Sequence, residues 1–208
     1  MPFKQPGRPD DCVVKDECTM CPDCASLQQQ LQHSAPFKRR QAARELANCP
    51  DASANLVAQL LCEPDGAVRE MIFSSLATLG DAVAVAGMVH CLRSEQAALR
   101  NEAIESMKNM PVQVAPIMAG LLNDADPDVR IFAVNILESL SHPNVEPWLI
   151  GVIEHDPEVN VCGTAVDLLC ELGSEAARAA LIQLKARFTD EPYIQFAADL
   201  ALKRLSTG

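Results

Sequence analysis

Residues 114–140 read VAPIMAGLLNDADPDVRIFAVNILESL, and this stretch decides the fold. Two apolar segments, each with its apolar residues three and four positions apart, flank the short polar turn NDADP. That spacing places the apolar side chains on one face of a helix. Proline starts a helix well and cannot continue one, and aspartate caps a helix start. The stretch therefore predicts two amphipathic helices joined by a tight turn.

The same pattern recurs along the chain from residue 36 onward. In each copy an arginine, or a polar replacement, is followed three positions later by a small or aliphatic residue. Successive copies lie 30, 31, 30, 30 and 35 residues apart. Such self-similarity is typical of a solenoid, in which each unit buries its apolar face by stacking on its neighbours. The copies are Arg39/Ala42, Arg69/Ile72, Arg100/Ala103, Arg130/Ala133, Asn160/Gly163 and Gln195/Ala198.

Proline, glycine and aspartate recur between the apolar segments and mark the breaks between helices. Strand signals are absent from the sequence. We therefore expect an all-α fold of about six helix pairs. The pairs are 25–33 with 36–48, 52–62 with 66–79, 82–93 with 96–109, 112–123 with 127–140, 144–155 with 158–171, and 174–187 with 192–206.

The fourth unit resembles a HEAT repeat. Pro116 in its first helix, Asp124 at the turn, and Val129 with Arg130 at the start of the second helix match that family's pattern. The resemblance covers about residues 35–206 and implies a right-handed α-solenoid. The repeats are about 30 residues long, shorter than the usual 40–47. They are similar to the short bacterial variety, which includes the lyases that attach bilins to phycobiliproteins.

The resemblance also implies a structural role for the acidic and arginine positions. In HEAT proteins they form a ladder of hydrogen bonds and charge pairs between stacked repeats, which we expect of Asp124 and Arg130. We call the recurring arginine positions the arginine column, and in each repeat the acidic position lies six residues before the column residue. It is occupied by Glu63, Asp124 and Glu154, and departs from the pattern at Ser94 and His33.

Four cysteines lie within thirteen residues near the N-terminus: Cys12, Cys18, Cys21 and Cys24. Thiolates favour zinc, copper(I) or iron–sulfur clusters over hard cations. The last three resemble the C-x2-C-x2-C run of bacterial ferredoxins, whose fourth ligand comes from elsewhere in the sequence, and Cys12 is the candidate for it. We predict a [4Fe–4S] cluster on residues 1–24, ahead of a repeat domain over 25–208. Zinc is the main alternative, and disulfides or unliganded thiols are another.

This layout is also similar to small repeat proteins of nitrogen-fixing bacteria, in which a cysteine cluster holding [4Fe–4S] precedes a helical solenoid. The other five cysteines are scattered through apolar helical stretches, where a free thiol acts as a small hydrophobe in a reducing compartment. They are Cys49, Cys62, Cys91, Cys162 and Cys170.

The charge distribution bears on the class of partner. The formal net charge is −11, and beyond residue 40 eleven Lys and Arg face twenty-three Asp and Glu. Such a surface repels phosphate backbones, which argues against nucleic-acid binding. The opening residues contain no apolar stretch, and no later one approaches membrane-span length, so we expect a cytoplasmic protein.

The sequence favours a binding function over a catalytic one. No G-x-S-x-G, phosphate-binding glycine loop or dinucleotide fingerprint occurs, and we expect the four histidines and Trp148 to serve turns and packing. The leading hypothesis is a HEAT-like adaptor that binds a protein on its concave face, with the cluster as cap, redox sensor or electron relay. The alternative is an accessory factor for cofactor handling, similar to bilin lyases or to metallocluster assembly. The polar residues expected on that face are Glu70, Asn101, Glu105, Asn135, Glu138 and Glu171.

Overall fold

The computed structural model describes residues 23–206, which form twelve α-helices and one short 3-10 helix. None of the helices in this range is long and apolar enough to cross a membrane. The helices are α1 (Cys24–Gln30), α2 (Pro36–Leu46), α3 (Ser53–Leu60), α4 (Gly66–Leu79), α5 (Ala82–Cys91), α6 (Ala97–Lys108), α7 (Pro111–Leu122), α8 (Pro127–Leu137), α9 (Val145–His155), α10 (Val159–Leu172), η1 (Glu175–Ala177), α11 (Arg178–Arg187) and α12 (Pro192–Leu205).

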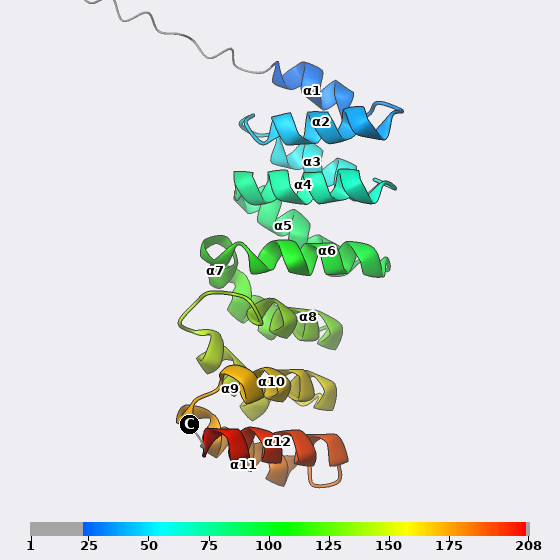
Figure 1. The fold of residues 1–208 in the computed structure, drawn as a ribbon. Helices are drawn as coiled ribbons and strands as arrows, with labels where there is room; N and C mark the ends of the chain where they lie inside the picture. The colour runs from blue at the N-terminus through cyan, green and yellow to red at the C-terminus, as the bar shows by residue number, and fades with distance from the viewer. Residues whose placement is uncertain (1–22, 207–208) are drawn as a thin grey trace, which may run out of the picture.

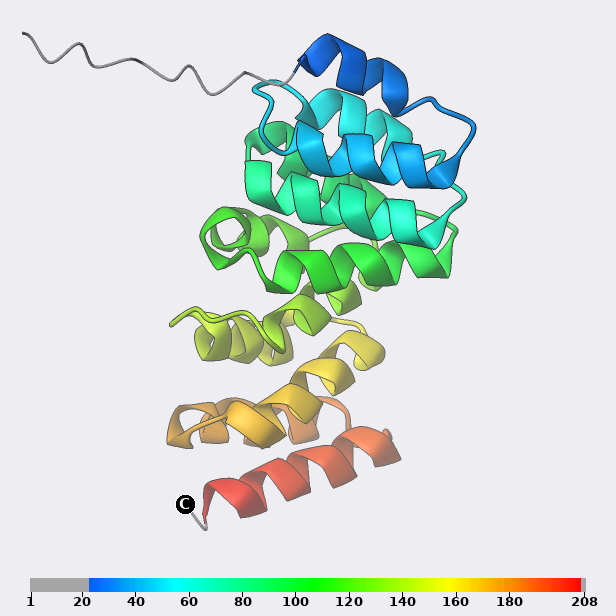
Figure 2. The same ribbon diagram turned by 45° about the horizontal axis from the view of Figure 1, so that its top comes forward.

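The helices form six antiparallel pairs stacked in one direction, with the first and last helices at opposite ends of the stack (Figure 1). The even-numbered helices, the second members of the pairs, lie side by side and form one face, which we call the second-helix face. The odd-numbered helices lie behind them, and the turned view in Figure 2 shows the same two layers. The predicted all-α repeat fold and its six pairs are confirmed.

Short polar side chains set the helix boundaries, as the sequence suggested. Asp65 and Asp81 accept hydrogen bonds from main-chain N–H groups in the first turns of α4 and α5, and Asp126 does so for α8. These bonds satisfy donors that a helix start leaves unpaired. At the other end of α4, Gly80 adopts a positive φ of 57°, which allows the chain to reverse into α5.

One continuous apolar core runs between the two helix layers and is built mainly from Leu, Ile, Val, Ala and Met. Small residues let some helices approach closely. At Gly87 in α5, an added Cβ would lie 2.3 Å from a methyl carbon of Val57 in α3. Glycine is therefore required at this contact by packing.

The arginine column has one structural task in four successive repeats. Each arginine donates from Nη1 to the main-chain carbonyl six residues earlier, over 2.6–3.2 Å. The bond ties the start of the second helix to the loop that follows the first helix. The donors and acceptors are Arg39 to His33, Arg69 to Glu63, Arg100 to Ser94, and Arg130 to Asp124.

The fifth repeat corrects the predicted register. Here Cys162 Sγ approaches the carbonyl oxygen of Asp156, six residues earlier, at 3.4 Å. Cys162 therefore occupies the column position that the sequence pattern assigned to Asn160. The steps become 32 residues from Arg130 to Cys162 and 33 from Cys162 to Gln195. Arg187 of α11 supplies the missing guanidinium and donates to the same Asp156 carbonyl at 2.8 Å.

The ladder between repeats is present, with partners that differ from those predicted. Arg130 forms a two-bond ion pair with Asp156 of the next repeat, at 2.6 and 3.0 Å, so the acidic position there is Asp156 and not Glu154. The Asp124 carboxylate pairs with Arg93, while Arg130 contacts only the Asp124 main chain. Register explains the change, because the fifth repeat is two residues longer than the sequence pattern assumed.

Ion pairs also connect neighbouring repeats at two other junctions. Arg39 pairs with Glu63 through bonds of 2.8 and 2.6 Å. Where the pattern departs at Ser94, Arg69 has no acidic partner at that position and pairs instead with Glu102, at 2.8 and 2.9 Å. Charge pairing therefore joins neighbouring repeats even where the acidic position itself is lost.

Glu63 is the most buried member of the ladder, with its side chain 0% exposed. Burial alone would raise the pKa of Glu63. Hydrogen bonds from the side chains of Arg39 and Gln59 and from the main chain of Asp65 outweigh burial, and the pKa of Glu63 lies below its ordinary value of 4.5. The charged carboxylate is therefore the form that stabilises this joint.

This lowered pKa predicts an acid-sensitive contribution to stability. A carboxylate with a depressed folded-state pKa stabilises the fold above its unfolded pKa, and the contribution is lost as pH falls through the folded-state pKa. We expect Glu63→Gln to lower the urea midpoint at pH 7, and the difference from the native chain to shrink as pH falls below 4.5. Urea titrations followed by circular dichroism at pH 7 and pH 3.5 measure both values. A difference that does not change with pH would contradict the prediction.

Candidate functional site

The predicted metal site falls only partly within the described residues. Cys12, Cys18 and Cys21 lie outside residues 23–206, so the metal site stays a prediction. Cys24 is the first residue of α1, and its sulfur is joined to Cys49 in a disulfide, with the two Cα atoms 5.9 Å apart. Within residues 23–206, no group of three or more His, Cys, Asp or Glu side chains is arranged to hold a metal ion.

The sequence-based prediction is wrong for two of the five scattered cysteines, Cys49 and Cys62. We expected Cys49 to be a free thiol in the core; it is buried but joined to Cys24. Cys91 and Cys162 are buried thiols as expected, whereas Cys62 is exposed. Burial raises the pKa of both Cys91 and Cys162 to about 11, so these two are protonated at neutral pH.

Three of the histidines make local contacts, two of them at turns and one within a helix. His33 and His142 each accept a main-chain N–H two residues onward through Nδ1, at 2.9 and 3.1 Å. His142 also stacks on Trp148, with ring centroids 4.9 Å apart, and Trp148 packs partly buried against the core. His155 Nδ1 lies 2.9 Å from the carbonyl oxygen of Gly151 in its own helix.

The second-helix face contains the surface that best fits a binding site. A groove of about 690 Å³ runs between α4 and α6, with Phe73 and Ala77 at its apolar floor. Glu70, Asn101 and Glu105 line it, three of the six polar residues that the sequence analysis expects on the partner-binding face. A smaller groove of about 240 Å³ between α8 and α10 includes the other three predicted residues, Asn135, Glu138 and Glu171.

The electrostatics of the face come from carboxylates, only some of which are neutralised. Lys108 bridges Glu105 and Glu138 at 2.9 and 2.7 Å and so links the two grooves. Glu102 is held by Arg69. Lys108 was not among the predicted site residues, because its position three residues after Glu105 reads from sequence as a simple helix pair. Its second bond, to Glu138 of the next repeat, is the one that connects the α4/α6 groove to the α8/α10 groove.

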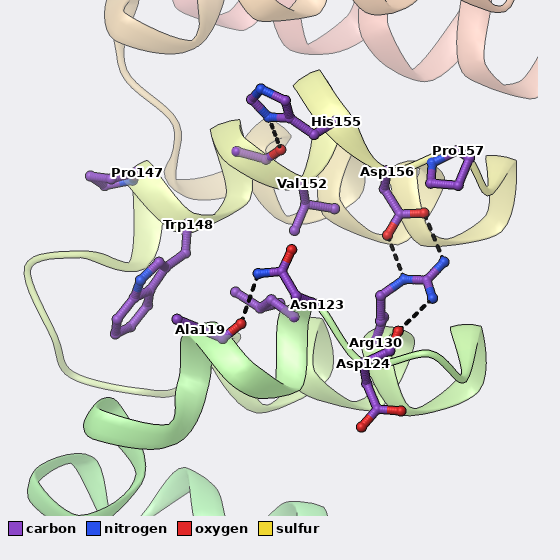
Figure 3. Close-up of a pocket in the computed structure, with 12 residues that line it drawn as sticks. Ala119, Asn123, Asp124, Arg130, Pro147, Trp148, Val152, His155, Asp156 and Pro157 are labelled. Atoms are coloured by element: carbon purple, nitrogen blue, oxygen red, sulfur yellow. Dashed lines mark hydrogen bonds and ion pairs between the residues drawn. The ribbon is translucent and has the colours of Figure 1, made fainter.

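A second cavity of about 420 Å³ lies between α7 and α9 (Figure 3). Trp148 and Asn123 line one side, and the Arg130–Asp156 pair lines the other. Both charges of that pair are already satisfied by each other, and Arg130 also donates to the Asp124 carbonyl. The wall of this cavity is a structural charge pair, whereas the α4/α6 groove presents two exposed carboxylates, Glu70 and Glu105, of which Glu105 also bonds to Lys108.

Comparison with known proteins assigns the repeats to a family. The family model described as HEAT repeats matches residues 25–108 and 114–203, and the match begins after the N-terminal cysteines. This confirms the resemblance inferred from the fourth unit.

Two curated proteins are similar to this chain in sequence. The bilin biosynthesis protein PecE of Mastigocladus laminosus is 31% identical over 151 residues, covering 71% of this chain and 56% of that protein. PecE of a Nostoc species is 40% identical over 76 residues, covering 36% of this chain and 30% of that protein. The chain therefore spans about half the length of the first relative and less of the second.

Among solved structures, the complex of CpcE and CpcF of phycocyanin lyase from Nostoc sp. PCC7120 matches with a TM-score of 0.37 and 18% identity. That match covers 95% of this chain and 100% of the matched chain.

Proposed function

Because this chain belongs to the HEAT-repeat family, we propose that it is a scaffold that binds a protein partner along its second-helix face. The observation that carries the proposal is the groove between α4 and α6. It combines an apolar floor at Phe73 with exposed carboxylates at Glu70 and Glu105. A protein segment that places apolar side chains on the floor and Lys or Arg beside the carboxylates complements both features.

The similarity to PecE supports a more specific partner. Those relatives are named bilin biosynthesis proteins, and we propose that the partner here is a protein that accepts a bilin. Free bilins bear propionate groups, which the carboxylates of the groove would repel. The groove therefore suits the protein that receives the bilin better than the bilin itself, and the proposed role is accessory.

The proposal predicts a charge-dependent interaction with an apo-phycobiliprotein subunit. We expect Glu70→Lys with Glu105→Lys to weaken binding at least tenfold, because repulsion replaces attraction at the centre of the groove. The matched control is Glu95→Lys with Glu154→Lys, which changes the net charge equally in a loop and on α9. All four residues are exposed, and the bond from Lys108 to Glu105 that the first pair of changes removes is an exposed pair worth less than about 1 kcal/mol, so neither double variant should unfold. Isothermal titration calorimetry at low and moderate salt measures the affinities.

Two outcomes would contradict the proposal. Equal affinity for the two double variants would exclude the groove as the binding surface. If the chain bound a free bilin in preference to the apo-subunit, the proposed accessory role would be excluded, because that role requires the chain to bind the protein that accepts the bilin.

A further inference from the structure

The second-helix face changes in chemistry from one end of the stack to the other. Two positions in each second helix, the first and the fifth residue after the arginine column, lie one helical turn apart on the same side of the helix. In α4 and α6 these residues line the α4/α6 groove, so the two positions mark the outer surface of the face. With Cys162 and Gln195 as the last two column residues, the series from α2 to α12 is Arg40 and Arg44, Glu70 and Ser74, Asn101 and Glu105, Ile131 and Asn135, Gly163 and Asp167, and Phe196 and Leu200.

The face begins with a basic zone on α2, formed by Arg40 and Arg44. Both side chains are exposed, and together with Met71 of α4 they line a groove of about 250 Å³. The equivalent positions of α4, α6, α8 and α10 contain no Lys or Arg. Guanidinium groups form strong paired hydrogen bonds with carboxylates. This end of the face therefore fits acidic side chains of a partner.

The centre of the face is an acidic zone. Glu70, Glu105 and Asp167 occupy three of the equivalent positions between α4 and α10, and all three are exposed. The Tyr193 hydroxyl donates to the Asp167 carboxylate at 2.5 Å and so connects this zone to α12. Carboxylates spread over several repeats fit Lys or Arg side chains that follow one another along a partner chain.

The face ends in an apolar zone on α12, formed by Tyr193, Phe196 and Leu200. Their side chains are 54%, 67% and 43% exposed. Their spacing of three and four residues aligns them in one stripe along the helix. Large apolar side chains that stay grouped and exposed on a folded chain mark an interaction surface. This end of the face therefore fits apolar side chains of a partner.

We propose that the second-helix face binds one extended protein segment in a fixed direction, with acidic residues on α2, basic residues along α4 to α10, and apolar residues on α12. The proposal rests on the proposed function, which names the face, and adds the order of residues in the partner. Neighbouring helices pack about 8–10 Å apart, so the five steps from α2 to α12 span about 40–50 Å. An extended chain covers that distance with about 12–15 residues. A segment bound in the opposite direction would lose the contacts at both ends.

The test uses the full chain and two synthetic peptides of about 15 residues with the same composition. The ordered peptide has a Glu block, a central Lys block and a Leu block. The permuted peptide has the Lys block first and the Glu block in the centre, so that like charges meet in both charged zones. We expect the ordered peptide to bind at least tenfold more tightly by fluorescence anisotropy, because only its order complements all three zones.

Variants of the two end zones test the direction of binding. Arg40→Glu should weaken the ordered peptide at least threefold, whereas Lys38→Glu, an equal charge change elsewhere on α2, should not. Phe196→Ser with Leu200→Ser should weaken it at least fivefold. The matched control is Val112→Ser with Ile182→Ser, which removes two exposed apolar side chains from the first-helix layer.

Crosslinking locates the two peptide ends directly. A benzophenone at the acidic end of the ordered peptide should crosslink to residues 36–46, and one at the apolar end to residues 192–205, as read by mass spectrometry. Equal affinities for the two peptides, crosslinks from both ends to the same helix, or no binding of either peptide would each overturn the inference. The apo-subunit titration with Glu70→Lys and Glu105→Lys tests the proposed function separately. Binding there, without a preference between the peptides, would remove the direction and leave the groove as the binding surface.

Discussion

Replacing Arg39 with alanine is expected to lower the free energy of unfolding by about 3–5 kcal/mol, because it leaves a charged partner buried and unpaired. The Glu63 side chain is 0% exposed, and both of its oxygens accept bonds from Arg39. The remaining bonds, from the Gln59 side chain and the Asp65 main chain, do not carry a neutralising charge. Urea unfolding at pH 7, followed by circular dichroism, measures the loss.

Arg93→Ala is the matched control. Arg93 also pairs with an acidic residue of the next repeat, Asp124, but its side chain is 44% exposed. Exposed pairs contribute less than about 1 kcal/mol, and we expect a loss of that size. The double variant Arg39→Ala with Glu63→Gln should lose less than the sum of its two single changes, since no unpaired carboxylate remains. Equal losses for Arg39→Ala and Arg93→Ala would show that burial does not govern the ladder.

The second large effect is expected from Gly87→Ala, which should destabilise the chain by about 1–3 kcal/mol through overpacking. The new Cβ would lie 2.3 Å from Val57, a branched side chain with little freedom to move aside. The clash opposes the intrinsic helix preference of alanine over glycine, about 1 kcal/mol. Thermal and urea unfolding of the variant measure the balance.

Gly120→Ala in α7 is the control of opposite sign. An added Cβ there meets nothing within 4 Å, so the helix preference acts alone and we expect a gain of up to about 1 kcal/mol. Adding Val57→Ala to Gly87→Ala should recover part of the lost stability by making room for the methyl group. A stabilised Gly87→Ala variant would mean that α3 and α5 are not in close contact at this point.

Helical periodicity and the breaks at Pro, Gly and Asp were sufficient to predict the six helix pairs. The fifth repeat was misaligned because its column residue is Cys162, which lacks the guanidinium that identifies the position elsewhere. Asp156 was missed for the same reason, since counting six residues back from Asn160 leads to Glu154. In both cases the fifth repeat lacks the arginine by which the column position is recognised in the earlier repeats.

Contacts between distant residues set the other limit. The six polar residues expected on the partner-binding face follow from spacing within single helices, and all six lie on the second-helix face; the two grooves that they line there were not predicted. The pairing of Cys24 with Cys49 depends on how α1 packs on α2, and the bridge from Lys108 to Glu138 depends on how α6 meets α8. Neither contact follows a spacing rule, so only the folded chain reveals them.

The uneven burial of the ladder makes the stack unequally stiff along its length. The joints at Arg39–Glu63 and Arg130–Asp156 are buried, whereas the middle of the stack is joined by the more exposed pairs Arg93–Asp124 and Lys108–Glu138. Dissolved ions weaken exposed pairs far more than buried ones. The solenoid should therefore bend most easily between α6 and α8, beside the α4/α6 groove, and this compliance should rise with ionic strength while the joints at Arg39–Glu63 and Arg130–Asp156 stay rigid.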